Sequence, residues 1–381
     1  MTSPIVAVIG GGQLARMMAP AATALGVTLR VLVESDSAPA AAPAHETVVG
    51  LPTDPEAIAR LLAAPRPAAV TFEHEHIPAE VFAACDEAGV PVRPGLAALT
   101  FAQDKIEMRA RMDQLGLPNP AWAEARSEAD VARFLAEHGG EAILKTARGG
   151  YDGKGVMVIR DVADARPWLD AAAAGGPRLL LEQKVPFVRE LAVQIARRPS
   201  GEARTWPVVE SLQRDGVCAE VTAPAPDLDP QRAAEAEEIA RTVAEALDVT
   251  GALAVELFET EDGILINELA MRPHNSGHWS MDGAVTGQFE QHLRAVLDLP
   301  LGDTTPTAPW TVMANVLGGA RIDLESALGD VTDAAAKIHL YGKDVRPGRK
   351  VGHVNLSGTD RAGTYERAVA AAAVVRDGAP A

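Results

Sequence analysis

The first hundred residues alternate between short apolar runs and amphipathic segments. The apolar runs have the length and the branched side chains of buried strands, and they lie at 5–9, 28–33 and 68–72. The segments between them repeat apolar residues at the spacing of a helix, over 13–25, 55–63 and 79–87. This alternation predicts a parallel α/β unit, in which ligands bind at the carboxyl ends of the strands.

From about residue 104 the pattern changes to helices followed by sets of strands. Helices are expected over 104–115, after the capping residue Ser127, and from Asp229, which precedes a proline at the first helical position. Strand-like apolar runs lie at 142–146, 155–159, 179–182, 191–196, 251–258 and 263–269. Consecutive strands with short connections pair antiparallel, so this part is predicted to be α+β.

A proline-rich stretch, 299–309, separates this region from the rest of the chain. Stretches of such composition commonly mark domain boundaries. We therefore expect an N-terminal α/β domain over 1–103, a central domain over 104–299 with a small lid subdomain at about 119–183, and a small β-rich C-terminal domain over 300–381. The alanine-rich end of the chain is expected to be frayed.

The last two strands of the central region predict a hairpin with two glutamates on one face. With Thr260 opposite Ile264 at the turn, Glu256 lies opposite Glu268. Side chains opposite each other in an antiparallel pair have Cβ atoms about 5 Å apart, and two carboxylates so close among apolar neighbours require a cation. Oxygen ligands on a rigid hairpin suit Mg²⁺, and Asn267 adds a neutral oxygen. Two solvated glutamates on an exposed face are the alternative.

A glycine-rich loop over 149–155 joins two of the predicted strands. Its glycines allow positive φ and let backbone N–H groups approach a ligand, so the loop can fold over triphosphate oxygens and open again. Lys145, at the end of the preceding strand, is placed to meet inner phosphates, and Lys154 to reach the γ-phosphate or a second substrate. The loop is not a Walker loop, because no Gly-Lys-Ser/Thr opens a helix. A flexible hairpin tip is the alternative.

A nucleotide also needs a base pocket, and the run 179–185 offers a candidate. It is an apolar strand that breaks into polar residues, where main-chain groups can hydrogen-bond an adenine edge while Glu190 reaches the ribose. An ordinary buried strand is the alternative.

Composition narrows the class of protein. The chain has 381 residues, 47% of them hydrophobic, which is long enough for two or three domains with cores. Its formal net charge of -17 repels nucleic-acid backbones, so no nucleic-acid partner is expected. Neither a membrane-spanning apolar run nor the features of a signal peptide are found. Two distant cysteines, Cys85 and Cys218, are too few for a disulfide framework or zinc site; buried reduced thiols and a cytoplasmic location are expected.

Four segments together resemble those of one ligase family, at 8–17, 149–155, 265–279 and 346–355. The runs Arg-Pro-His-Asn-Ser-Gly-His-Trp and Pro-Gly-Arg-Lys-Val-Gly-His are the most distinctive. By these segments the chain resembles the N5-carboxyaminoimidazole ribonucleotide synthetases of the ATP-grasp superfamily, in the family's order and over nearly the whole chain. The resemblance implies an ATP-grasp fold of mixed α/β and α+β class, with a parallel α/β domain before the ATP-grasp domain and a small β-rich domain after it.

The resemblance also implies a reaction. ATP, bicarbonate and 5-aminoimidazole ribonucleotide would give N5-carboxyaminoimidazole ribonucleotide, ADP and phosphate, in de novo purine biosynthesis. Bicarbonate would attack the γ-phosphate to form carboxyphosphate, which delivers its carboxyl group to the amine. This intermediate hydrolyses readily, so a lid must exclude water, while cations and Mg²⁺ meet the charge of the transferring phosphoryl group. The family further implies a homodimer.

Residue roles follow from the same resemblance. ATP would be held by Lys105, Lys145, Gly150, Tyr151, Asp152, Gly153, Lys154, Gly155, Val156, Glu182, Gln183, Lys184, Val185, Glu190, Asn267 and Glu268. Magnesium would be held by Glu256 and Glu268. Arg272, His274 and Asn275 would act on bicarbonate and carboxyphosphate, with Asp152 and Lys154 as further catalytic candidates. The ribonucleotide would meet Gln13, Leu14, Glu73, Tyr151, Asp152, Lys154 and Lys350; Glu75 lies on the same face as Glu73, and for either one a solvated carboxylate is the alternative.

Three positions depart from the family pattern. Val156 stands where glutamine is common, so a side-chain contact would be lost there while the backbone contact remains. Gln213 replaces a histidine associated with the nucleotide site. Lys105 stands where arginine is frequent, which keeps the charge but loses the bidentate fork.

The main rival from another class is an NAD-dependent oxidoreductase. Gly10, Gly12 and Ala15 fit the dinucleotide fingerprint after a strand, and Glu34 stands where a ribose-binding acid belongs. This interpretation leaves the second glycine loop and the paired glutamates unexplained. Other rivals are an ATP-grasp ligase with another acid or amine, such as a formate-using ribonucleotide ligase, and a nucleotide sensor without activity.

Overall fold

The computed structural model describes residues 3–150, 155–214 and 216–378. The N-terminal part is a parallel four-stranded sheet in the order β3-β2-β1-β4. Its strands are β1 (Ile5–Ile9), β2 (Thr28–Val33), β3 (Glu46–Val49) and β4 (Ala69–Phe72). The parallel α/β prediction is confirmed, and only β3 was missed, because this edge strand is mostly exposed and lacks a buried apolar pattern.

Helices pack on both faces of this sheet, and apolar side chains fill a core on each side. They are α1 (Gln13–Ala24), α2 (Pro55–Leu61) and α3 (Ala79–Glu87), whereas α4 (Leu96–Gln103) packs mainly against the segments 105–114 and 264–270. The sequence predicted the first three. Helix α4 was not predicted, because its apolar residues are spread around the helix instead of forming one stripe.

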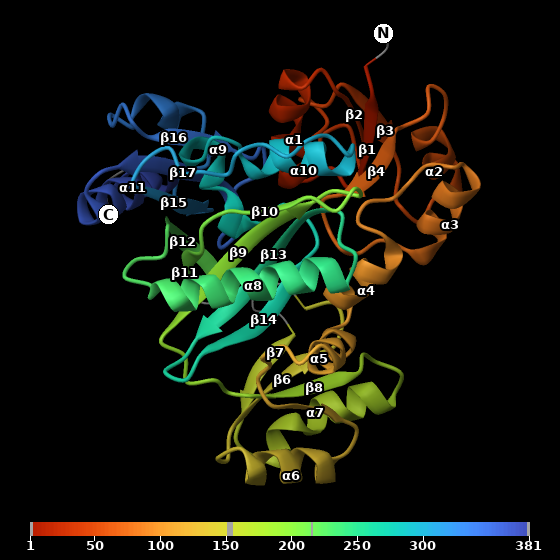
Figure 1. Ribbon diagram of the computed structural model, residues 1–381, viewed down its shortest axis with the longest axis vertical. Helices are drawn as coiled ribbons and strands as arrows, with labels where there is room; N and C mark the ends of the chain where they lie inside the picture. Colours follow the sequence, from red (N-terminus) through yellow and green to blue (C-terminus); the bar gives the residue numbers. More distant parts are fainter. Residues whose placement is uncertain (1–2, 151–154, 215, 379–381) are drawn as a thin grey trace.

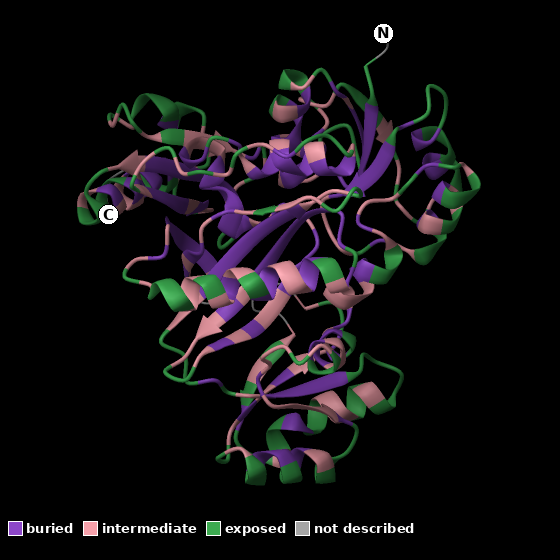
Figure 2. Ribbon diagram, in the orientation of Figure 1, coloured by how far each residue is buried: buried purple, intermediate pink, exposed green. Residues whose placement is uncertain are grey.

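A second, antiparallel sheet in the order β5-β8-β6-β7 projects from the body of the molecule (Figure 1). Its strands are β5 (Trp122–Ala125), β6 (Ala142–Thr146), β7 (Val156–Ile159) and β8 (Leu179–Gln183). Helix α5 (Lys105–Gln114) leads into it, while α6 (Glu128–Glu137) and α7 (Val162–Ala173) pack on the sheet around a core of their own. The outer faces of these two helices are exposed (Figure 2). We call β5–β8 with α6 and α7 the lid.

The largest sheet has nine strands and runs β14-β13-β9-β11-β12-β15-β17-β16, with β10 beside β9. Its strands are β9 (Arg189–Arg197), β10 (Ala203–Thr205), β11 (Val209–Arg214), β12 (Val217–Ala223), β13 (Gly251–Glu259), β14 (Ile264–Ala270), β15 (Trp310–Leu317), β16 (Lys337–Leu340) and β17 (Lys350–Gly358). Within the described residues its strands pair antiparallel, as predicted for the central region. Helix α8 (Pro230–Ala246) crosses the β9–β13 face (Figure 1).

The hairpin register confirms one prediction and corrects another. Glu256 pairs with Glu268 as expected, but at the turn Glu259, and not Thr260, lies opposite Ile264. An irregularity between Glu256 and Leu257 removes the difference of one residue. A β-bulge of this kind adds one residue to a single strand. The predicted pairing of the glutamates is therefore correct although the predicted register at the turn is wrong.

The C-terminal strands extend the central sheet instead of forming a separate one, because β15 pairs with β12. One face of these strands packs on α11 (Arg361–Asp377). The expectation of a frayed alanine-rich tail is wrong for this segment: Ala368, Ala371 and Ala372 are buried in the interface. Small side chains let the helix approach the sheet, and alanine also has the highest helix propensity.

The N-terminal sheet is joined to the central sheet through α10 (Gln288–Val296). The Ala252 N–H donates to His292 Nδ1 over 3.0 Å, so His292 Nε2 carries the proton and donates to Thr71 Oγ1 over 2.9 Å. Burial lowers the pKa of His292 to about 3, so this buried histidine stays neutral and links both sheets.

The short elements around the last helices complete the chain. They are η1 (Asn275–Gly277), α9 (Ser280–Gly283) and η2 (Ser326–Gly329). Cys85 and Cys218 are free and buried, as predicted. Among the helices in the described ranges, none has the length and apolar character needed to cross a bilayer.

Candidate functional site

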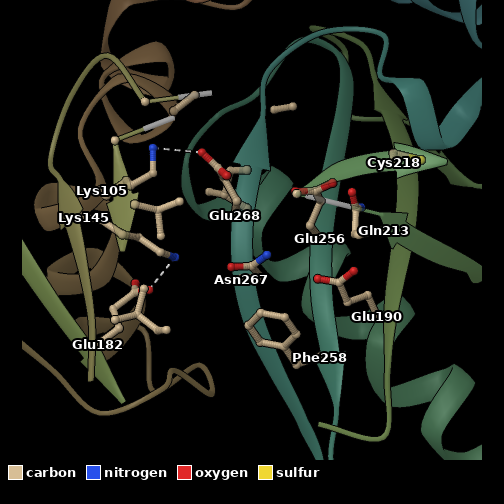
Figure 3. Close-up of a pocket in the computed structure, with 18 of the residues that line it drawn as sticks. Lys105, Lys145, Glu182, Glu190, Gln213, Cys218, Glu256, Phe258, Asn267 and Glu268 are labelled. Atoms are coloured by element: carbon tan, nitrogen blue, oxygen red, sulfur yellow. Dashed lines mark ion pairs between the residues drawn. The ribbon is translucent and has the colours of Figure 1, made fainter. Parts of the chain in front are cut away.

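A cleft of about 500 Å³ lies between the lid and the central sheet. Lysines face it from the lid side, while carboxylates and an aromatic ring face it from β9, β13 and β14 (Figure 3). Most of the residues predicted to hold ATP line this cleft, together with Glu256, Arg272, His274, Asn275 and Lys350. Gln13, Leu14 and Glu73 are not among its lining residues.

The paired glutamates project from the hairpin into the cleft. Glu256 and Glu268 are directly opposite each other on β13 and β14, and Glu190 on β9 pairs with Phe258, so that it shares their face of the sheet. Lys105 Nζ is 3.0 Å from Glu268 Oε1. The His274 ring Nε2 is 3.8 Å from Glu256 Oε1, and the charges of Lys350 and Arg272 also act on this carboxylate.

This crowding of acids changes their protonation. Burial, then the charges of Glu268 and Glu190, raise the pKa of Glu256 to about 8. Burial raises the pKa of Glu190 to about 7. Carboxyl groups held in such an environment gain much more from an added cation than ordinary surface carboxylates do.

The donor set suits Mg²⁺. Within residues 3–150, 155–214 and 216–378, no group of three or more His, Cys, Asp or Glu side chains is placed to hold a metal ion. Mg²⁺ needs less than that, because it keeps waters and shares phosphate oxygens while one or two carboxylates hold it. Glu256 and Glu268, with the side-chain oxygen of Asn267 on the same edge of the cleft, supply this kind of incomplete oxygen shell.

Lys145 reaches the cleft from strand β6 of the lid. In the sheet, Ile143 pairs with Glu182 and Lys145 with Leu180, so Lys145 and Glu182 are diagonal neighbours on one face. Lys145 Nζ is 2.5 Å from Glu182 Oε2. Burial alone would raise the pKa of Glu182, but the charges of Lys145 and Arg109 outweigh it and hold the pKa at about 2.

The glycine loop bounds the cleft on the lid side. Gly150, Gly155 and Val156 line it; Tyr151, Asp152, Gly153 and Lys154 lie outside the described residues. Gly155 has a φ of +69°, and a Cβ there would lie 2.6 Å from Thr146 Oγ1. The turn at the base of the loop therefore requires glycine.

The predicted base pocket also has aromatic walls that the sequence reasoning missed. Val185 lies in the cleft as predicted, and Phe187 stacks on Phe258 with ring centroids 4.9 Å apart and planes at 12°. Gln183 and Lys184 line the rim, and Lys184 Nζ is 3.1 Å from Glu141 Oε1. Phe258 could have been found, because it is two residues from Glu256 on the same strand and so faces the same side.

The turn after β14 carries the three predicted groups for bicarbonate chemistry. Arg272 Nε donates to Glu75 Oε2 over 2.9 Å. Burial, then the charges of Arg272 and Lys350, lower the pKa of His274 well below its usual value, so the ring is neutral. The Asn275 side chain is buried, and among the described residues neither its oxygen nor its nitrogen has a partner beyond a weak interaction with the Cys218 thiol. The structure brings all three to the cleft.

The first glycine turn binds one of the protein's own carboxylates. Glu73 accepts from the Gly12 N–H over 2.5 Å, the Leu14 N–H over 3.1 Å and the Ala15 N–H over 3.3 Å. A Cβ at Gly12 would lie 2.2 Å from Glu73 Oε1. In a dinucleotide-binding turn these N–H groups meet a pyrophosphate. The oxidoreductase interpretation therefore loses its anion site, and the glycines are explained by an internal contact.

The other predicted ribonucleotide ligands lie around this turn or in the cleft. Leu14 is buried in the N-terminal core, and Gln13 Oε1 accepts from Lys343 of the C-terminal segment. Lys350, at the start of β17, lines the cleft, and its charge lowers the pKa of Glu256 and Cys218. Gln213 also lines the cleft, where its side chain donates to Ser211 Oγ over 3.2 Å.

Family models match three consecutive parts of the chain. A ribonucleotide synthetase preATP-grasp domain matches residues 3–103, an ATP-grasp domain residues 110–289, and a phosphoribosylaminoimidazole carboxylase C-terminal domain residues 311–367. The order is that of the three regions expected from the sequence.

Individual relatives agree with these models. The N5-carboxyaminoimidazole ribonucleotide synthase of Mycobacterium tuberculosis is 49% identical over 378 residues, which cover 97% of this chain and 87% of that protein. The synthetase structure from Thermus thermophilus is 37% identical, with a TM-score of 0.86 over 97% of this chain and 98% of that one. An enzyme from Aspergillus clavatus, solved with ADP and 5-aminoimidazole ribonucleotide, is 31% identical, with a TM-score of 0.88 over 99% of both chains. With the carboxylates, lysines and glycine turns in place, the chain belongs to the N5-carboxyaminoimidazole ribonucleotide synthase family, and it is an ATP-dependent ligase of purine biosynthesis.

Proposed function

We propose that the nucleotide lies between the lid and the hairpin, and that the residues facing this cleft divide the reaction among them. The observation that carries the proposal is that Lys105 of α5 and Lys145 of the lid face carboxylates of the central sheet across one cleft (Figure 3). Lys145 would meet the inner phosphates, Val185 and the Phe258 ring the adenine, and Glu190 the ribose. The N–H groups of the glycine loop would close over the outer phosphates.

Glu256 and Glu268 would hold Mg²⁺, with Asn267 beside them. When bound there, the ion supplies positive charge to the phosphate oxygens and orients them for transfer. Lys105, which neutralises Glu268 at 3.0 Å, would turn toward the phosphates once the ion takes its place. The two lysines and the hairpin thereby concentrate charge where the transferring group becomes most negative.

Arg272, His274 and Asn275 would hold bicarbonate against the γ-phosphate and then hold carboxyphosphate. Arg272 is fixed by Glu75, so its guanidinium keeps its direction without a ligand. The neutral His274 and the unsatisfied carboxamide of Asn275 can hydrogen-bond a small oxyanion. Water must be kept from carboxyphosphate, which gives the lid a second role besides binding.

The ribonucleotide would enter from the side of Lys350 and the N-terminal sheet. Lys350 lies in the cleft, while Gln13 approaches from α1 and is held by Lys343. Because Glu73 already occupies the N–H groups of the glycine turn, the substrate phosphate would depend on side-chain cations and not on that turn. Glu73, Tyr151, Asp152 and Lys154 remain predicted contacts of this substrate.

We further propose that the chain acts in the cytoplasm as a homodimer, with domains over 1–103, 104–299 and 300–381. The family resemblance supports these assignments, and gel filtration with light scattering tests the dimer. The lid sheet, with a core of its own between residues 122 and 183, supports a subdomain at about 119–183.

The experiment that tests the function is a coupled assay of ADP formation. Bicarbonate and 5-aminoimidazole ribonucleotide together should stimulate ADP release, and formate should not replace bicarbonate. Equal rates with formate would favour the formate-using ligase.

Residue roles are tested in the same assay with Lys350→Ala. This change should raise the KM for the ribonucleotide by about tenfold or more, because a charge-assisted contact is lost, and leave the KM for ATP nearly unchanged. Equal losses for both substrates would remove Lys350 from the ribonucleotide site.

A further inference from the structure

Arg109 is a fully buried arginine behind the cleft. It lies on α5, one helical turn after Lys105. Its side chain has an exposed fraction of 0%. A buried guanidinium is costly unless all its donors are satisfied, so the partners of Arg109 indicate what it does. Arg109 does not line the cleft, so its side chain does not reach a ligand bound there.

The guanidinium joins the lid to the hairpin. Its Nε donates to Glu182 Oε1 on β8 over 2.6 Å. Its two terminal nitrogens donate to the carbonyls of Ile266 over 2.6 Å and Asn267 over 2.7 Å, on β14 next to Glu268. Asn119, in the connection between α5 and the lid, accepts a further bond over 3.0 Å. These anchors on three segments fix Arg109 in place.

Glu182 is thus shared by a fixed cation and a movable one. Its Oε1 is bound by Arg109, and its Oε2 by Lys145 over 2.5 Å. The Lys145 side chain is 16% exposed and lines the cleft, whereas Arg109 is not among the residues that line the cleft. A ligand phosphate can therefore draw away Lys145 but not Arg109.

We propose that Arg109 is a positioning residue: it remains as the counter-ion of Glu182, so that Lys145 can exchange this carboxylate for the phosphates of the nucleotide. The proposal rests on the proposed nucleotide site. Without Arg109, the departure of Lys145 would leave a carboxylate that is 5% exposed without a cation, and such a group strongly resists losing its last partner. Lys145 would then stay on Glu182 and be lost to the nucleotide.

The test compares MgADP binding, measured by calorimetry, in folded variants of the full chain. Arg109→Met should weaken binding by about tenfold or more, the effect of losing one charge-assisted contact. Arg111→Met is the matched control, because Arg111 lies on the same helix and its side chain bonds Gln114 and the Ala246 carbonyl, away from Glu182. It should bind MgADP as the wild type does. Arg109→Lys, which keeps the charge beside Glu182, should recover most of the affinity.

A double-mutant cycle separates positioning from general structural support. In a Lys145→Met background, Arg109→Met should cost less than about threefold in MgADP affinity, because the contact it serves is already gone. Full additivity of the two losses would overturn the proposal, as would unchanged binding in Arg109→Met.

A second background covers the case in which Arg109→Met does not fold. With Glu182→Gln no buried charge needs a counter-ion, so Arg109→Met in this background should fold and bind MgADP within about threefold of Glu182→Gln alone. A loss as large as in the presence of Glu182 would overturn the proposal. If the wild-type chain itself fails to bind MgADP, it is the proposed nucleotide site that fails.

Discussion

Glu73 and Glu256 are two carboxylates whose pKa is raised by burial, yet their surroundings differ in one respect. Glu73, at the end of β4, accepts three backbone N–H bonds from the first turn of α1. Glu256, in the middle of β13, faces a second carboxylate across the hairpin and has a neutral histidine 3.8 Å away. The first carboxylate is bound by backbone donors, whereas the second faces a like charge that the charges of Lys350 and Arg272 offset only in part.

The difference separates a structural acid from a functional one. A buried polar group that is satisfied contributes to the fold, whereas one left beside a like charge is destabilising unless a ligand compensates it. The glycine turn resembles a nucleotide site by sequence but is filled from within. The hairpin, which has no named sequence motif, holds the acidic pair to which we assign the cation.

The largest effect is expected from removing one member of the acidic pair. Glu268→Gln should lower ATP turnover by about 10²–10³-fold or more, because the metal-bound phosphate loses its anchor. ADP release measures the effect, and circular dichroism should show an intact fold. Glu261→Gln, in the exposed turn of the same hairpin, should behave as wild type. Near-normal ADP release in Glu268→Gln would contradict the metal role.

An intermediate effect is expected for the stability of metal-free protein. The pKa of Glu256 is about 8 in the fold, against 4.5 for an unperturbed glutamate. The protonated Glu256 therefore contributes fully to the free energy of unfolding below pH 4.5, and this contribution is lost as the pH rises through 8. Glu256→Gln should be more stable than the wild type at pH 9 by about 2 kcal/mol, after discounting for partial exposure of the side chain.

Urea denaturation at pH 4 and pH 9, with a chelator present, measures this difference. Adding Mg²⁺ and ADP at pH 9 should favour the wild type and not Glu256→Gln, because only the wild type keeps both carboxylates. A stability difference that does not change with pH would show that Glu256 is already compensated.

The smallest effect is expected at the glycine turn. Glu73→Gln should cost about 1 kcal/mol of unfolding free energy, because the amide nitrogen of Gln would face backbone donors. The loss is limited, since burial disfavours the charged form of Glu73. Glu34→Gln, at the exposed end of the neighbouring strand, is the control for thermal unfolding, and an equal shift in both variants would remove the special role of Glu73.

Much of the fold followed from periodicity, and the failures have local causes. Strands β1, β2 and β6 and helix α3 lie where their apolar patterns placed them. The bulge beside Glu256 could not be predicted, because it changes the pairing without changing the alternation of side chains. Helix α11 was mistaken for a frayed tail, since alanine alone does not show which face is buried.

In the cleft, charged residues were easier to predict than the groups behind them. Lys145, Glu256 and Glu268 carry chemistry that stands out from apolar neighbours, and the structure brings them to one cleft. The sequence signal of Arg109 was weaker: it lies four residues after Lys105 and therefore on the same side of the helix. Its contact with Glu182 depends on the tertiary fold and could not be predicted from this spacing. The partners of Glu73 depend on how β4 meets α1, which one strand pattern does not specify.

The continuity of the large sheet has a consequence for shortened forms of the chain. Strand β12 is covered along its outer edge by β15, which comes almost a hundred residues later. A chain cut before residue 310 would expose the N–H and C=O groups of β12 as an open edge, and such edges recruit strands from other molecules. Truncation at the proline-rich stretch should therefore give aggregates and not a smaller active enzyme, and a soluble, monodisperse fragment of residues 1–309 would show that the C-terminal strands are dispensable for solubility.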